Sequence, residues 1–559
     1  MSERNKSAKT GLRAGYVSQL EQRIADLEQE FRLFKHQIPQ ADQQIETEAP
    51  RQHLEGNLQP LTVSLQDDAS SWQTAASTGE QGGSHQDFQR AAGYDTGLTS
   101  AMLAEFCTIW FEKYHPWFPI LHQPTVSEYC QQLQQGSSSD IPLTLKAMAA
   151  VILPVYCPHP SVDPTQWKKR SEWVRDEVTL AAIHNLSLES LQALLIISIA
   201  EFGDGRLSEY WNLIALCKRM STQLGLRDLV AHQCANFAVS SSHIPPRMLS
   251  VPSTTVELEE KIRAFWATQA LDSASTLGVA WHLGVSKPEL AASLPCSDDI
   301  WGFSEALVSV YRFINAEGPS CFSLFVRLVT NELWHVHNFL QQPYLIVSEA
   351  DVQQKQKDCM AVDQLLADLQ KDFNDMLTLN LPPCMDLFSN DTVQDQHQNS
   401  VLIHCTIDSA IISLYQRSIL PTHQSNSDLP RQPWKHAVER CQQSYIHMGN
   451  ILRNANESIL ASINPLIIYS IFVSARYCII YHKAMDLDVP YQTHFLISAL
   501  TICGQRWSLA RQLQKVLAAA MFETNVSIPT RNPLPEEFYD LQYFSLDIAE
   551  ALKEWYEPA

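Results

Sequence analysis

The feature that most constrains the fold is a recurring pattern of apolar residues spaced three and four apart, which runs from Thr99 to the C-terminus. Leu191, Leu194, Leu195 and Ile199 form one such run. This spacing places apolar side chains on one face of an α-helix. A β-strand with one buried face would instead carry an apolar residue at every second position, and no stretch of the sequence sustains that alternation. The sequence therefore predicts an all-α fold, with a large helical body over residues 99–559.

Local signals refine the positions of these helices. Thr254-x-x-Glu257 has the spacing of a capping box and predicts a helix start, and Gly225 predicts a helix C-terminus. Two polar stretches, 239–253 and 390–400, are expected to be surface loops. Further helices are expected around residues 324–340, 358–378, 399–419, 434–454, 463–485 and 494–521.

The longest apolar run spans Pro465 to Tyr481 and is interrupted by Arg476. A membrane-spanning helix requires about 18 or more uninterrupted apolar residues. The run is therefore expected to form a buried core helix, and no membrane association is predicted.

Charge is distributed unevenly along the chain. The 559 residues hold 61 Asp and Glu against 40 Lys and Arg, a formal charge of −21, which excludes a protein whose whole surface is basic for nucleic acid. Residues 1–15 nevertheless carry +3 and form a predicted basic arm. Its four cations could contact DNA phosphates or could belong to a plain solvated tail. They are Arg4, Lys6, Lys9 and Arg13.

A heptad pattern follows the basic arm and predicts a coiled-coil dimerisation helix over residues 16–37. In a parallel pair, Arg23 would face Glu28 of the other chain and Glu30 would face Lys35, so both cross-pairs attract. An ordinary amphipathic helix packed on its own chain is the alternative. The seam consists of Val17, Ile24 and Phe31 at a positions and Leu20, Leu27 and Phe34 at d positions.

Residues 38–98 have the composition of a disordered linker. They are rich in Gln, Ser, Gly and Pro, with nine acidic residues against Arg51 and Arg90. Such a segment buries too little apolar surface to offset the entropy of ordering its backbone. Hydrophobic residues such as Leu54 and Trp72 are spaced among the acids, as in activation segments, although a plain tether also contains a few.

No catalytic or metal-binding constellation is evident. The motifs GxxxxGK[ST], HExxH and GxSxG are absent. No two of the 13 cysteines are closer than 17 residues, so a compact zinc site has no ligand pair, and the thiols are expected to be buried hydrophobes in a reducing compartment. His335 and His337 would project about 200° apart on a helix and cannot bind one metal together. Asp298 and Asp299 are expected at a helix N-terminus. No catalytic residue or metal ligand is predicted.

Several motifs occur in an order that is known from one protein family. Residues 11–28 resemble its linker and dimerisation helix, and Phe111 to Thr125 resembles the first signature of its helical domain. The second signature is similar to Leu191 to Leu226, and the third to Glu260 to Asp272, ending at Leu294-Pro295. Together they resemble the fungal binuclear zinc-cluster transcription factors and their fungal-specific transcription factor regulatory domain.

The resemblance is that of a divergent member. Where the family has paired arginines followed by Trp-Trp, this chain has Lys261-Ile262-Arg263 followed by Phe265-Trp266. Where the family has Asp-Arg and Gly-Arg-Pro, it has Asp272-Ser273 and Gly278-Val279-Ala280. The family's six-cysteine cluster, which binds two zinc ions, would precede Met1, and the first cysteine here is Cys107. The chain is therefore expected to bind no cofactor itself, with two zinc ions only if an N-terminal cluster exists.

The resemblance implies a nuclear transcription factor or transcriptional regulator of RNA polymerase II genes, which controls a metabolic or secondary-metabolite gene cluster. Its partners would be DNA, through a missing or incomplete N-terminal module, a second chain in a homodimer or heterodimer, and the transcription machinery. The alternative is a non-DNA-binding interaction protein that dimerises with a full-length zinc-cluster factor and modulates it. An all-helical enzyme acting on a hydrophobic metabolite is a remote third hypothesis without a motif in its favour, so a non-enzymatic role is predicted.

Overall fold

Helices account for most of the described chain from Gly97 onward. The computed structural model describes residues 97–136, 140–156, 164–232, 248–250, 252–275, 294–296, 301, 320–342, 348–379, 390–420, 433–525, 533–544, 548 and 551–552. All of them belong to one unit, residues 85–559. The predicted basic arm, the coiled coil and nearly all of the linker lie outside the described residues, and their boundaries stay predictions.

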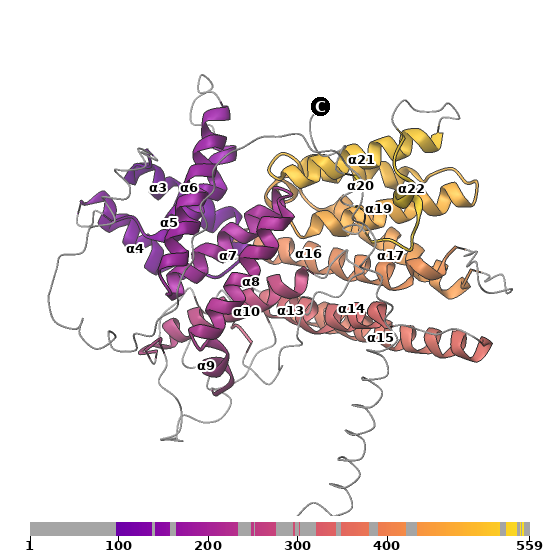
Figure 1. The fold of residues 1–559 in the computed structure, drawn as a ribbon, viewed down its shortest axis with the longest axis horizontal. Helices are drawn as coiled ribbons and strands as arrows, with labels where there is room; N and C mark the ends of the chain where they lie inside the picture. The colour runs from indigo at the N-terminus through magenta and orange to yellow at the C-terminus, as the bar shows by residue number, and fades with distance from the viewer. Residues whose placement is uncertain are drawn as a thin grey trace, which may run out of the picture. The chain divides into compact units, whose positions relative to one another are not determined.

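A first group of helices runs from α3 to α10 (Figure 1). Within it, α5 packs against α7, α6 packs against both, and α8 and α10 pack against α7 and against each other. Its members are α3 (Ser100–Lys113), η1 (His115–Trp117), α4 (Gln123–Gln134), α5 (Leu143–Ile152), η2 (Leu153–Val155), α6 (Pro164–His184), α7 (Leu188–Gly203), α8 (Leu207–Gln223), α9 (Leu226–His232) and α10 (Thr255–Ala274).

A second group runs from α13 to α22, coloured from salmon to yellow in Figure 1. Here α16 packs along α15, α17 and α19, and α19 packs in turn against α20 and α21. Its members are α13 (Cys321–Arg327), η3 (Leu328–Glu332), α14 (Leu333–Gln341), α15 (Glu349–Leu379), α16 (Asn390–Tyr415), η4 (Gln416–Ser418), α17 (Lys435–Asn454), α18 (Glu457–Ser462), α19 (Ile467–Ala484), α20 (Tyr491–Cys503), α21 (Ser508–Asn525) and α22 (Glu536–Tyr539).

The described residues contain no β-strand, so the all-α prediction is confirmed for this part of the chain. The capping box is also confirmed, because Thr254 Oγ1 accepts a hydrogen bond from Glu257 N at 3.1 Å. The Glu257 carboxylate reaches back to accept one from Ser253 N at 2.8 Å. Gly225 follows α8 with a φ of +71°, the left-handed conformation typical of a helix C-terminus.

Two predictions about individual segments are wrong. Residues 390–400 are not a loop but the first turns of α16. Helical backbone hydrogen bonds form whatever the polarity of the side chains. At the end of this stretch, Asn399 Nδ2 donates a hydrogen bond to the Pro116 carbonyl at 2.6 Å. The expected helix 494–521 is divided into α20 and α21. Its apolar spacing continues across the break because both helices pack against α19.

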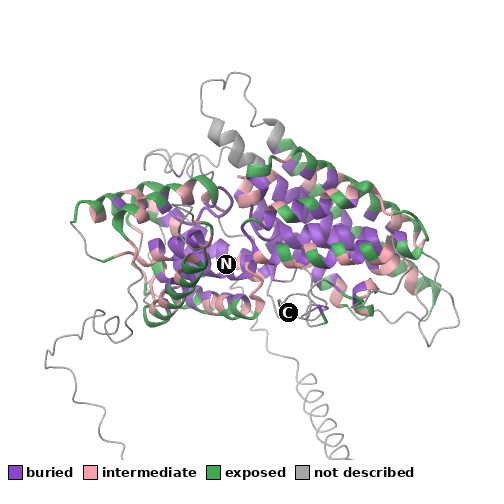
Figure 2. Cartoon of the chain, turned by 90° about the horizontal axis from the view of Figure 1, so that it is seen from above, coloured by how far each residue is buried: buried purple, intermediate pink, exposed green. Residues whose placement is uncertain are grey.

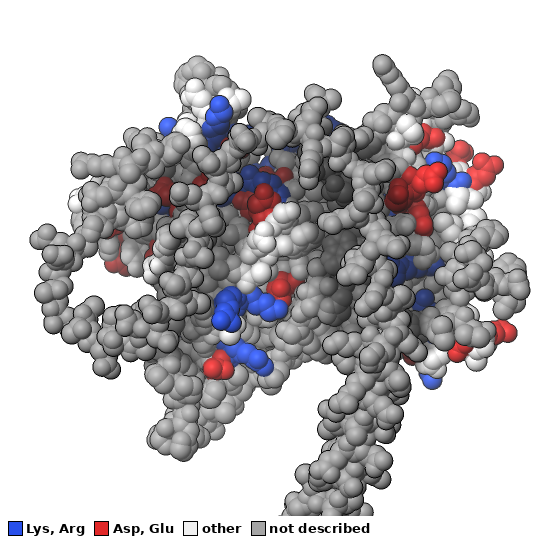
Figure 3. Space-filling view, in the orientation of Figure 1, with Lys and Arg blue, Asp and Glu red and all other residues white. Residues whose placement is uncertain are grey.

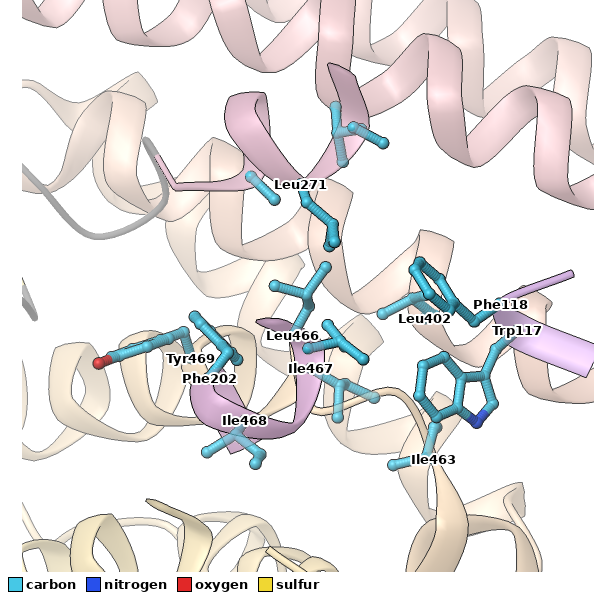
Figure 4. Close-up of a cluster of buried hydrophobic side chains, with 14 of the residues drawn as sticks. Trp117, Phe118, Phe202, Leu271, Leu402, Ile463, Leu466, Ile467, Ile468 and Tyr469 are labelled. Carbon is cyan, nitrogen blue, oxygen red and sulfur yellow. The ribbon is translucent and has the colours of Figure 1, made fainter. Parts of the chain in front are cut away.

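The buried residues form one core that extends across both groups, as the purple interior of Figure 2 shows. In Figure 4, Phe202 of α7 and Leu271 of α10 lie near Leu466, Ile467 and Tyr469 of the second group. The helix predicted from the apolar run is α19, and it is buried over nearly its whole length. Nine of the ten described cysteines are buried too. Among the helices that the structure describes, none combines the length and apolarity needed to cross a membrane.

Two tryptophans fix the junction of the two groups. Trp117 Nε1 donates to the Ser462 carbonyl and Trp507 Nε1 to the Ile463 carbonyl, both at 2.9 Å, so both indoles hold the turn before α19. Trp507 lies directly against Gly203 at the end of α7, where a Cβ would stand 2.2 Å from the indole ring. Only a glycine permits this close approach.

Candidate functional site

The residues predicted to contact DNA or to form the dimer all lie outside the described residues. This holds for Arg4, Lys6, Lys9 and Arg13 and for Val17, Leu20, Ile24, Leu27, Phe31 and Phe34. Their roles stay predictions. The three signatures of the helical body can be located, and they meet.

The first and third signatures meet at Arg263, a fully buried side chain of α10. Its Nε donates to Glu259 Oε1 at 2.9 Å, its Nη1 to the Pro119 carbonyl at 3.0 Å and its Nη2 to the Cys296 carbonyl at 2.7 Å. Glu259 Oε1 also accepts from Cys296 N at 2.8 Å. One buried ion pair thus joins three segments that are far apart in the sequence, and we call it the signature junction.

Aromatic groups enclose the guanidinium. Arg263 Cζ lies 4.1 Å from the Trp301 ring centroid, a cation–π distance. The His122 and His115 rings approach the same indole at 5.3 and 6.4 Å. Burial lowers the pKa of both histidines, and the Arg263 charge lowers it further. Both imidazoles are therefore neutral near pH 7 and do not supply positive charge for binding phosphate.

The second signature joins the same region through Gln192 of α7. Its Nε2 donates to the Ile120 carbonyl at 3.0 Å and to Glu260 Oε1 at 2.9 Å. Ile120 belongs to the first signature and Glu260 to the third. The motifs that were recognised separately in the sequence therefore form one buried, hydrogen-bonded unit.

A second polar cluster lies where α7 turns into α8. Asp204 pairs with Arg175 of α6 at 3.0 Å and with Arg506 at 3.4 Å, while Arg175 also contacts Glu201 at 3.2 Å. Arg206 Nε donates to the other oxygen of Glu201. Burial raises the pKa of Glu201 to about 7, although Arg175 opposes the shift. Because Arg506 precedes α21, this cluster ties the second group of helices to the first.

A third polar seam runs between α15, α16 and α17. The Arg440 guanidinium binds Asp363 through two hydrogen bonds of 2.8 and 2.7 Å, and Tyr415 donates to Asp363 Oδ2 at 3.0 Å. Further along, His447 Nδ1 lies 2.8 Å from Asp408 Oδ2. The hydrogen bond to Asp408 raises the pKa of His447, and burial raises that of Asp408 to about 6.

These clusters resemble a scaffold more than a reaction centre, because their charged groups bind one another or backbone carbonyls. Among the described residues, no group of three or more His, Cys, Asp or Glu side chains is placed to hold a metal ion. On the face shown in Figure 3, the described Lys and Arg side chains lie among Asp and Glu and do not form a continuous basic surface. Asp298 and Asp299 lie outside the described residues.

Sequence reasoning missed the partners of several charged residues. Nothing in the sequence links Arg506 to Asp204, which precedes it by about three hundred residues. The glycines on either side of Asp204 could have drawn attention to this site. Two glycines around an acidic residue indicate close packing or a left-handed backbone conformation, and Gly205 has a φ of +80°. Arg476 interrupts an apolar run in the sequence, and in the structure its buried guanidinium donates hydrogen bonds to backbone carbonyls of residues 537–543.

Comparison with known proteins adds to this picture. The model of the family described as "Fungal specific transcription factor domain" matches residues 108–403, from α3 into α16. The match includes all three signatures and the signature junction. The helices from α17 to α22 lie beyond it.

One similar protein is named "Notoamide biosynthesis cluster transcriptional coactivator notQ′", from Aspergillus versicolor. It is 28% identical to this chain over 522 residues, which cover 89% of this chain and 88% of the relative. The similarity therefore extends over nearly the whole of both chains, including helices beyond the family match.

Proposed function

Because the chain belongs to the family that carries the fungal-specific transcription factor domain, we propose that it regulates transcription of RNA polymerase II genes in the nucleus, within a metabolic or secondary-metabolite gene cluster. The observation that carries the proposal is the family match over residues 108–403, which contains all three signatures and the buried Arg263–Glu259 pair. The domain is a transcription-factor domain, and such proteins are typically not enzymes.

The mode of action that we favour is coactivation. The relative from Aspergillus versicolor is named a transcriptional coactivator of a biosynthesis cluster. In this chain, the corresponding role would be to bind a DNA-bound factor and the transcription machinery through the acidic helical body. Dimerisation with that factor through Val17 to Phe34 would place the body at the promoter.

Direct DNA binding is the second mode. It would use the basic arm for phosphate contacts and a six-cysteine cluster for base readout, with two zinc ions bound by that cluster. The basic arm supports phosphate contact only, since four cations carry no sequence information on their own.

Deletion of the gene tests the regulatory role. We expect the transcripts of a contiguous set of biosynthetic genes to fall together, as measured by RNA sequencing, and to recover on complementation. Unchanged transcripts under all conditions that express the protein would contradict the proposal.

A charged substitution in the heptad separates the two modes. Leu20→Glu with Leu27→Glu should abolish co-precipitation with the partner factor, while Leu54→Glu in the linker serves as a control and should leave it intact. A gel shift with the purified chain on promoter DNA then distinguishes direct binding from binding that requires the partner.

A further inference from the structure

An exposed stripe with a large apolar content runs along α6 (Figure 1). Trp173, Leu180 and Ile183 are 45%, 60% and 53% exposed, more large hydrophobic side chains than any other described helix exposes. The exposed Lys169 and Asp176 complete a spacing of four, three, four and three, which places all five residues on one face of the helix. The opposite face packs against α5, α7 and η2. We call these five residues the α6 stripe, and such exposed apolar surface is typical of a binding site.

The charge at the centre of the α6 stripe argues against a second copy of this chain as its occupant. Asp176 lies midway between Lys169 and Ile183. Two stripes aligned over their full length would therefore bring Asp176 opposite its own counterpart, whether they packed in parallel or antiparallel. Like charges in that position oppose association. The stripe is instead complementary to an occupant that carries a cation between two apolar side chains.

The chain enters the helical body beside the α6 stripe. Gly97 is the first described residue and lies against Arg170, since a Cβ on this glycine would stand 3.0 Å from Nη2 of the arginine. Arg170 precedes Trp173 on α6 by about one turn, and its guanidinium lies 4.8 Å from the Trp167 ring centroid. Leu98 packs against the core. The residues that precede Gly97 therefore start next to one end of the stripe.

The residues just before this point have side chains that match the stripe. We call residues 85–96 the entry segment, and it contains Phe88 and Tyr94 on either side of Arg90. Arg90 is its one Lys or Arg. The unit that contains the helical body begins where the entry segment begins. An aromatic–cation–aromatic order in this segment thus corresponds to the apolar–acidic–apolar order of the stripe.

The lengths of the two segments agree as well. Arg90 precedes Gly97 by seven residues, and such a stretch spans about 10 Å as a helix and about 24 Å when extended. Asp176 follows Arg170 by six residues on α6, a rise of about 9 Å. Arg90 can therefore reach Asp176, and Phe88 can reach the apolar end of the stripe beyond it.

We propose that the entry segment binds along the α6 stripe, antiparallel to α6. Arg90 pairs with Asp176, while Phe88 and Tyr94 cover the apolar residues on either side of this pair. The linker would then leave the helical body at the C-terminal end of α6, and only its part before residue 85 would be a free tether. This inference goes beyond the proposed function and does not depend on it.

Amide hydrogen exchange of the full chain, followed by mass spectrometry, tests the binding. Leu180→Glu with Ile183→Glu changes the apolar end of the stripe without altering the core, and we expect the amides of the entry segment to exchange about tenfold faster than in the wild type. Met360→Glu is the matched control, because Met360 of α15 is 49% exposed and lies on another helix. It should leave this exchange unchanged. Equal thermal unfolding of the three proteins checks that the body stays folded.

A charge reversal tests the predicted ion pair. Asp176→Arg alone and Arg90→Glu alone should each raise the exchange of the entry segment about threefold, because each places like charges together at an exposed site. The two substitutions combined should restore the wild-type rate, since the pair is re-formed with its charges exchanged. A double variant that exchanges as fast as the two separate effects together would overturn the pairing.

Other outcomes would give the stripe a different occupant. Self-association that is lost in Leu180→Glu with Ile183→Glu, and kept in Met360→Glu, would assign the stripe to a second copy and overturn the inference. Entry-segment amides that exchange at the rate of an unfolded chain in the wild type and in the stripe variant alike would overturn it too, leaving the stripe to another protein. The proposed function fails by a different result, namely unchanged transcripts on deletion of the gene.

Discussion

Arg263 and Arg476 are both fully buried, yet they are held by different kinds of partner. Arg263 pairs with a carboxylate one turn away on its own helix and binds carbonyls of two segments that flank α10. Arg476 binds four carbonyls of one short segment near the chain end. We expect the first arrangement to break only when the core unfolds, and the second, which holds the short segment 533–544, to open while the core stays folded. The same residue type thus serves a permanent junction and a separable one.

The largest expected effect is at the permanent junction. Glu259→Ala leaves the Arg263 charge buried without its carboxylate, which should lower the free energy of unfolding by about 3–5 kcal/mol. Urea denaturation followed by circular dichroism measures the loss. Removing Glu439 from its exposed pair with Lys435 is the control and should leave the midpoint unchanged. Equal midpoints for both variants would contradict the role given to Glu259.

The next effect is expected where α7 meets Trp507. A Cβ in Gly203→Ala would clash with an indole that its hydrogen bond to Ile463 holds in place, so we expect a loss of about 3 kcal/mol. Gly136→Ala is the comparison, since nothing lies within 4 Å of its Cβ and only the φ of +68° is unfavourable. Its loss should be about 1 kcal/mol. Thermal unfolding of both variants would show whether packing or backbone strain dominates.

A pH titration sharpens the comparison inside the second group. Burial lowers the pKa of His404 to about 4, below its unfolded value, so the unfolded state takes up the proton first and stability falls as the pH drops below about 6.5. Between about pH 7.5 and pH 5.5 this loss should reach about 1.4 kcal/mol, and His404→Gln should remove it.

His447 should behave in the opposite way. Asp408 raises its pKa, so its contribution is present below about pH 6.5 and is lost as the pH rises through the raised value. His447→Gln therefore reduces stability at low pH more than at high pH. Two variants with the same pH slope would refute these assignments.

The smallest effect on global stability is expected for Arg476→Met. The loss cannot exceed the free energy with which residues 533–544 pack on the helical body, because these residues can detach while the core stays folded, and we expect about 1 kcal/mol in urea denaturation. A loss as large as that of Glu259→Ala would mean that the segment is part of the core.

Much of the helical body was predictable because its signals are local. The Thr254 cap, the Gly225 terminus and the apolar run of α19 depend on residues within one or two turns, and the structure confirms them. The start of α16 was not predicted, because its polar residues indicate a loop. One of them, Asn399, donates a hydrogen bond to the Pro116 carbonyl, a contact that exists only in the folded chain.

The sites were less predictable because they depend on long-range contacts. Residues 119 and 263 meet only in the folded chain, and a sequence gives no indication of which carbonyl a buried arginine will bind. The resemblance located the signatures that contain Arg263, and the family match agrees with it. Arg476 belongs to no signature, so its role emerged from the structure alone. The basic arm and the heptad stay predictions.

Amide hydrogen exchange of the full chain, followed by mass spectrometry, tests most directly whether the two arginines hold a permanent and a separable junction. The account predicts that amides of Leu541 to Phe544 exchange at least about a hundredfold faster than those of Ile262 to Ala267, because the segment opens without the core. Exchange of both stretches at one common rate would contradict it, since residues 541–544 would then leave only when the whole body unfolds.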